Sequence, residues 1–137
     1  MDKIKTLSAI ILFLLIHSEI ISQNKNEFQI AQQYQRSGEC EKAIILYQKF
    51  EKEKVPINSF YNNYLNCLIK LNKYSEAEKL IKKTKKIFPK NLTYSIDLGF
   101  IWKLKGFDKK AIKEYDKIIF NIDKEKINQI NSIATKF

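Results

Sequence analysis

Apolar residues recur at helical spacing along most of the chain, on both sides of regularly placed breaks. Leu98 and Trp102 are four residues apart, and after Gly106 the apolar residues Ala111 and Tyr115 show the same interval. An interval of four residues places side chains on one face of an α-helix. Two such stretches separated by a glycine predict a helix, a short turn and a second helix.

The same pattern returns every 34 residues, without a gap. One column of this period holds alanine, at Ala43, Ala77 and Ala111. A second column holds the two residue types that best tolerate the left-handed conformation at a helix end, at Gly38, Asn72 and Gly106. The period divides the chain into windows 24–57, 58–91 and 92–125, and the first two close near Pro56 and Pro89, where proline stops a helix. We therefore predict three helix–turn–helix repeats.

These columns resemble the tetratricopeptide repeat, which places Leu-Gly, then an aromatic residue, then alanine with an aromatic residue four positions later, then proline. The third window is the most similar, with Leu98, Gly99, Trp102, Ala111 and Tyr115, although Asp123 stands where the family has proline. The resemblance implies an all-α fold, a right-handed α-solenoid of about three helix–turn–helix repeats plus one further helix. The small residues Ala31 and Gly99 on first helices predict close approach of the paired backbones.

Residues 126–137 carry a further helical stripe after the third window. Its apolar members are Ile127, Ile130, Ile133, Ala134 and Phe137. We predict an amphipathic helix here, either a capping helix for the array or the start of a truncated fourth repeat of a longer protein.

An apolar run close to the N-terminus, from Leu7 to Ile16, is interrupted only by Ser8 and follows Lys3 and Lys5. A membrane span needs about 20 apolar residues, so a run of this length predicts no stable span. It is typical of a signal peptide, which we place at residues 1–22 with cleavage near Ser22. The alternative is an uncleaved anchor. We therefore expect an exported protein that is periplasmic, bound to the cell envelope or secreted.

The net charge is +10, from 25 basic and 15 acidic residues. In an exported protein this charge favours acidic proteins or an anionic envelope surface over nucleic acid. One group of lysines crowds the predicted second helix of repeat two, at Lys79, Lys82, Lys83, Lys85 and Lys86. We interpret this group as either a basic convex face for an anionic surface or an ordinary solvated helix face.

Catalytic chemistry has few residues available. The single histidine, His17, leaves with the signal peptide, and two cysteines cannot complete a four-ligand zinc site. No glycine-rich phosphate loop is present. We expect no enzymatic activity and no cofactor. Cys40 and Cys67 either form a disulfide in an oxidising compartment or pack as small apolar side chains.

The resemblance implies that a ligand binds the concave side, which the first helices line. The positions concerned are Phe28, Gln32, Gln35 and Arg36 in repeat one, Asn62, Asn63, Asn66 and Lys70 in repeat two, and Asp97, Phe100 and Lys103 in repeat three. Amide side chains both donate and accept hydrogen bonds, as the backbone of an extended peptide requires. The alternative is that these are solvated polar residues.

Some members of the family clamp a C-terminal carboxylate, but here only Asn63 matches that set and Asp97 replaces its arginine, so this function is not expected. The sequence favours a non-catalytic scaffold that binds a protein or peptide partner. The alternatives are a spacer at the start of a longer envelope-associated repeat protein and electrostatic attachment to an anionic surface.

Overall fold

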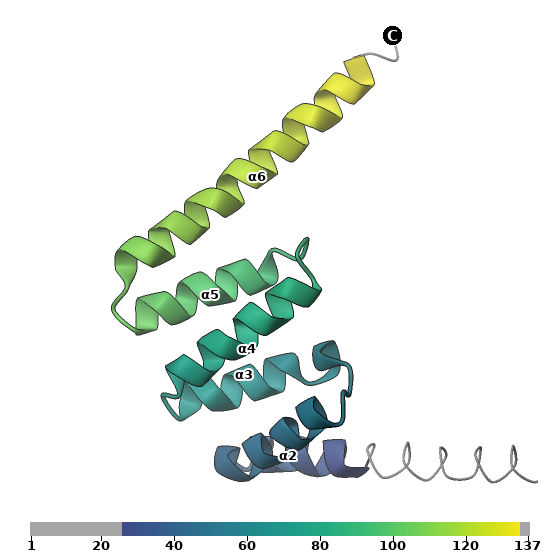
Figure 1. The fold of residues 1–137 in the computed structure, drawn as a ribbon, viewed down its shortest axis with the longest axis vertical. Helices are drawn as coiled ribbons and strands as arrows, with labels where there is room; N and C mark the ends of the chain where they lie inside the picture. The colour runs from purple at the N-terminus through teal and green to yellow at the C-terminus, as the bar shows by residue number, and fades with distance from the viewer. Residues whose placement is uncertain (1–25, 135–137) are drawn as a thin grey trace, which may run out of the picture. The chain divides into compact units, whose positions relative to one another are not determined.

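A computed structural model describes residues 26–134, with side chains through Lys126, and all regular structure in that range is helical (Figure 1). Residues 26–36 are helical and are followed by α2 (Cys40–Lys52), the short 3-10 helix η1 (Ile57–Ser59), α3 (Tyr61–Lys70), α4 (Tyr74–Ile87), α5 (Thr93–Leu104) and α6 (Asp108–Ala134). The predicted all-α repeat fold is confirmed. None of the helices in this range combines the length and the apolarity that crossing a membrane requires.

The turn inside each helix pair has the predicted left-handed residue. The φ angles are +85° at Gly38, +57° at Asn72 and +77° at Gly106. In the third turn, the Gly106 N–H donates to the Lys103 carbonyl at 3.0 Å and the Phe107 N–H donates to the Trp102 carbonyl at 2.7 Å. This pair of bonds satisfies carbonyls that the helix end leaves without partners.

Two of the helices end shortly before a proline. The second helix of repeat one, α2, ends ahead of Pro56, and α4 ends just before Pro89. At the corresponding place in repeat three, Asp123 carries a normal backbone N–H, so nothing stops the helix and α6 continues to Ala134. The residues predicted to form a separate helix after 125 are therefore the last turns of α6, as far as the described residues extend.

The chain divides into two compact units, Met1–Cys67 and Leu68–Phe137. The core of the first unit is a cluster of aromatic rings from α2 and from the segment that leads into α3. The Tyr47 and Phe60 rings are stacked, 5.9 Å apart and inclined by 3°, and Tyr64 lies 5.5 Å from Tyr47. Phe50 meets Phe60 edge-on at 5.8 Å. These side chains are almost completely shielded from solvent, so they supply much of the apolar burial that stabilises the first unit.

In the second unit, α4, α5 and α6 run antiparallel to their neighbours along the chain (Figure 1). A Cβ atom added to Gly99 on α5 would lie 2.4 Å from the Tyr115 ring on α6, so only glycine allows this approach. The structure therefore explains the glycine that the sequence places there. On α6, Ala111 and Ile118 are buried, whereas the described side chains beyond Ile118 are exposed.

Candidate functional site

The exposed face of α5 is the most apolar of the predicted binding positions. Ile96, Phe100 and Leu104 recur every four residues and expose 50%, 45% and 38% of their surface. Lys103 lies on the same face and is exposed. We call Ile96, Phe100, Lys103 and Leu104 the α5 stripe. The sequence predicted Phe100 and Lys103 for this face, together with Asp97, which is half-buried.

Leu104 was absent from the predicted set, although its spacing from Phe100 could have indicated it. The solvent face of an amphipathic helix is ordinarily polar, but Leu104 exposes a large apolar side chain on this face. The stripe therefore offers three apolar side chains and one cation to solvent along about two turns of helix.

The corresponding face of α3 is polar. Asn62, Asn66 and Lys70 recur at the same interval and are exposed, while Asn63 is half-buried. Buried Tyr61 and Leu65 occupy other positions of this helix. The amides predicted for peptide binding are thus accessible on α3.

In repeat one the predicted residues differ from one another in their surroundings. Arg36 is exposed, and Gln32 and Gln35 are half-buried. Phe28 is also half-buried, and its ring lies 6.3 Å from that of Phe50. Phe28 therefore packs against α2 and has part of its surface committed to the core.

The lysine group on α4 is partly neutralised. Lys82 pairs with Glu78 at 2.6 Å, and Lys85 pairs with Glu114 of α6. The other three lysines are exposed, at Lys79, Lys83 and Lys86. A basic face made of all five lysines stays a prediction, and at least two of its charges, on Lys82 and Lys85, have acidic partners within the protein.

Glu78 on α4 contacts two lysines and an indole, and so joins α4 to the end of α5. It accepts hydrogen bonds from Lys82 and Lys105, each at 2.6 Å, and from Trp102. Burial alone would raise the pKa of this carboxyl, but the bonds from Lys105, Lys82 and Trp102 outweigh it and lower the pKa to about 2. Glu78 is therefore ionised and acts as a tie between two helices.

Glu114 is the most deeply buried carboxylate of the described residues, with a relative exposure of 4%. Burial opposes its charge, but hydrogen bonds from Lys85 and Lys117 lower its pKa below the ordinary value. Because Lys85 comes from α4, this pair ties α6 to α4. The buried carboxylate is therefore compensated by two lysine partners.

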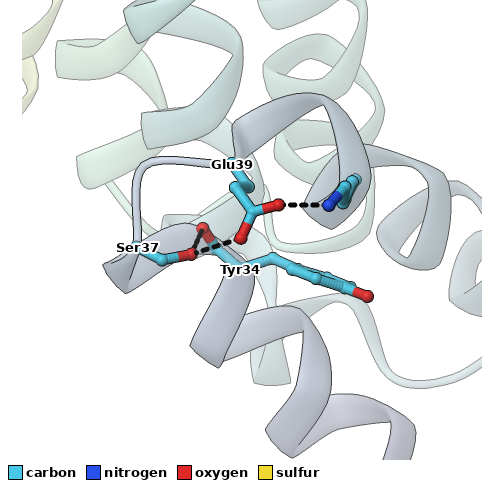
Figure 2. Close-up of polar contacts among 4 residues, drawn as sticks. Tyr34, Ser37 and Glu39 are labelled. Atoms are coloured by element: carbon cyan, nitrogen blue, oxygen red, sulfur yellow. Dashed lines mark hydrogen bonds and ion pairs between the residues drawn. The ribbon is translucent and has the colours of Figure 1, made fainter.

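The turn of repeat one is closed by its own polar side chains (Figure 2). The Ser37 hydroxyl lies 3.0 Å from both the Tyr34 carbonyl oxygen and the Glu39 carboxylate. Lys42 pairs with Glu39, and its amine lies 5.3 Å from the centre of the Tyr34 ring. The bonds from Lys42 and then Ser37 lower the pKa of Glu39. Glu39, which precedes α2, therefore belongs to a self-contained turn.

Cys40 and Cys67 are buried, and neither is in a disulfide. Among the described side chains, no group of three or more His, Cys, Asp or Glu residues is placed to hold a metal ion.

A comparison with protein families shows which family the chain resembles. A family described as anaphase-promoting complex, cyclosome, subunit 3, a tetratricopeptide-type repeat family, matches residues 2–84, which is more than half of the chain. The match covers the first predicted repeat, the second as far as residue 84 and the residues from 2 onward that were predicted as a signal peptide, and α5 and α6 lie beyond it. No curated protein matches the sequence. Repeats of this type generally mediate protein interactions and are generally non-catalytic.

Proposed function

Because the chain belongs to the tetratricopeptide-type repeat family of anaphase-promoting complex subunit 3, we propose that it is a non-catalytic scaffold that binds a segment of a partner protein. We further propose that it acts outside the cytoplasm, after export directed by residues 1–22. The observation that carries the binding proposal is the α5 stripe, where Ile96, Phe100 and Leu104 are exposed along one helix face.

Exposed apolar side chains in a row favour a protein partner. Burying apolar surface is worth about 25 cal/mol per Å², so three large side chains that become covered supply several kcal/mol toward binding. A partner segment with apolar residues at matching intervals would cover Ile96, Phe100 and Leu104, and Lys103 would select a nearby carboxylate. Independently of the stripe, the exposed amides of Asn62 and Asn66 in the first unit are suited to hydrogen-bond the backbone of an extended peptide.

The experiment is site-specific photo-crosslinking in the source cells. A photoreactive phenylalanine analogue replaces Phe100 in one variant and Ile87 in a matched control, because Ile87 is also an exposed apolar residue but lies on a second helix. We expect one defined partner to cross-link at position 100 and not at position 87. Equal cross-linking at both positions, or none at position 100, would refute the binding proposal.

The export proposal has its own test, since residues 1–22 lie outside the described residues. N-terminal sequencing of the protein isolated from its source cells should give a first residue close to Gln23. A protein that starts at Met1 and is recovered with the cytoplasmic fraction would contradict export and leave the binding proposal standing.

A further inference from the structure

The third turn differs from the other two at the residue that follows the left-handed position. The equivalent residues are Glu39, Lys73 and Phe107. Glu39 pairs with Lys42, and Lys73 pairs with Glu76 at 3.3 Å, so both of these turns satisfy their own charges. The third turn instead presents an aromatic ring.

Phe107 exposes 43% of its surface. Its ring is contacted by two lysine amines, that of Lys110 at 4.7 Å and that of Lys105 at 5.4 Å from the ring centre. Cation–π contacts of this kind place the lysine amines over the face of the ring. The ring is therefore a partly exposed apolar surface with positive charge held over its face.

The positive charge around Phe107 is only partly compensated. Lys105 is held by Glu78 at 2.6 Å. Lys109 and Lys110 are exposed, and neither forms an ion pair with any carboxylate among the described side chains. Asp108 lies between Phe107 and these two lysines and is the one acidic residue of the turn, so the local charge is positive.

The turn also borders an open depression on the surface. Gly106, Phe107, Asp108, Lys109 and Lys110 line an open depression of about 430 Å³. Gly106 leaves it open, since a Cβ atom there would meet nothing within 4 Å. We call these five residues the Phe107 turn. The turn thus combines an exposed aromatic ring, an open depression and lysine amines, and aromatic residues are enriched at protein interfaces.

We propose that the Phe107 turn is a docking site for an acidic segment of a partner protein, which places an apolar side chain in the hollow against Phe107 and carboxylates on Lys109 and Lys110. The hollow favours a peptide over an anionic lipid surface, because a protruding apolar side chain fills a depression beside the ring, whereas attraction of a membrane surface to the lysines does not require one. The proposal goes beyond the scaffold function, since it uses none of the residues of the α5 stripe.

A random peptide library displayed on phage is the probe, and the purified full chain is the bait. We expect the enriched peptides to combine acidic residues with leucine or an aromatic residue. Synthetic copies should bind Phe107→Ala at least about tenfold more weakly than the unsubstituted protein. Lys109→Gln with Lys110→Gln should also weaken binding and reduce its salt dependence. Lys73→Ala, at the equivalent position of repeat two, should leave binding unchanged.

Several results would overturn the proposal. The library could yield no enriched peptides, or enriched peptides without an excess of acidic residues. The peptides could also bind Phe107→Ala as tightly as the unsubstituted protein. Binding of phosphatidylglycerol vesicles that depends on Phe107, with no peptide binding, would identify a lipid ligand and also overturn it. Unchanged thermal melting of the lysine variants shows that their effects do not come from unfolding. Phe100→Ala changes the α5 stripe and leaves the Phe107 turn intact. A comparison of this variant with Phe107→Ala therefore shows which of the two proposed binding sites fails.

Discussion

Tyr47 offers a sharp test of how the first unit is stabilised. Its side chain is fully buried, and its hydroxyl has no hydrogen-bond partner among the described residues. Burial raises the pKa of Tyr47 well above its ordinary value, with smaller contributions from Cys67 and Cys40. The phenol therefore stays neutral and carries a desolvated hydroxyl in an aromatic core.

Tyr47→Phe removes that hydroxyl and retains the ring contacts with Phe50, Phe60 and Tyr64. An unsatisfied buried hydroxyl costs about 1–3 kcal/mol. Removing the oxygen atom leaves a void of roughly 15 Å³, which costs about 0.4 kcal/mol and offsets part of the stability gained. We therefore expect the free energy of unfolding to rise by about 1 kcal/mol, which raises the Tm by roughly 4 °C.

Urea and thermal unfolding followed by circular dichroism measure this change. The control is Tyr74→Phe, because the Tyr74 hydroxyl donates to Asn72 Oδ1 at 2.6 Å. That variant makes the same chemical change but loses a hydrogen bond, so it should be neutral or destabilising by up to about 1 kcal/mol. If Tyr47→Phe is less stable than the unsubstituted protein, the hydroxyl has a partner and the reasoning is wrong.

Three further predictions concern single contacts. The pKa of Glu78 is about 2 in the folded protein and 4.5 ordinarily, so its contribution to stability is complete above about pH 4.5 and is lost as the pH falls toward 2. In urea unfolding, Glu78→Gln should lower the free energy of unfolding by about 1 kcal/mol near neutral pH and reduce its dependence on acid pH. Gly99→Ala should destabilise the protein by about 1–3 kcal/mol in the same assay, and less when combined with Tyr115→Ala, because the added Cβ meets the Tyr115 ring. Lys54→Gly should raise the Tm, since Lys54 has a φ of +58° and glycine avoids a strain of about 1 kcal/mol.

The fold was predictable because its main constraints are local. A left-handed residue at Gly38, Asn72 and Gly106 is required by the turn itself, and buried alanines at Ala43 and Ala77 are required by close helix packing. Both requirements return at a fixed period and are visible in the sequence. The end of α6 was not predictable from the period. The period places a helix end near residue 123, but Asp123 has the backbone N–H that proline lacks, so the helix continues through this position.

The candidate sites were only partly predictable. The partners of Lys85 and Lys105, which are Glu114 and Glu78, lie 29 and 27 residues away along the chain, so no local pattern distinguishes these lysines from solvated ones. The exposed positions of α3 and α5 follow from helical spacing, and the sequence identified most of them. Phe107 was not among the predicted site residues, because the 34-residue period selects positions at which the repeats are alike. The difference at this position, an aromatic residue where Glu39 and Lys73 are charged, was the available signal.

Binding of a partner segment through the α5 stripe is the central claim. The most direct measurement is the affinity, by titration calorimetry, of the segment that cross-links at position 100 for the unsubstituted protein, Phe100→Ala and the control Ile87→Ala. We predict a loss of affinity of about tenfold or more for Phe100→Ala and no change for Ile87→Ala. Equal affinities for all three proteins would contradict the claim that the α5 stripe is the binding surface.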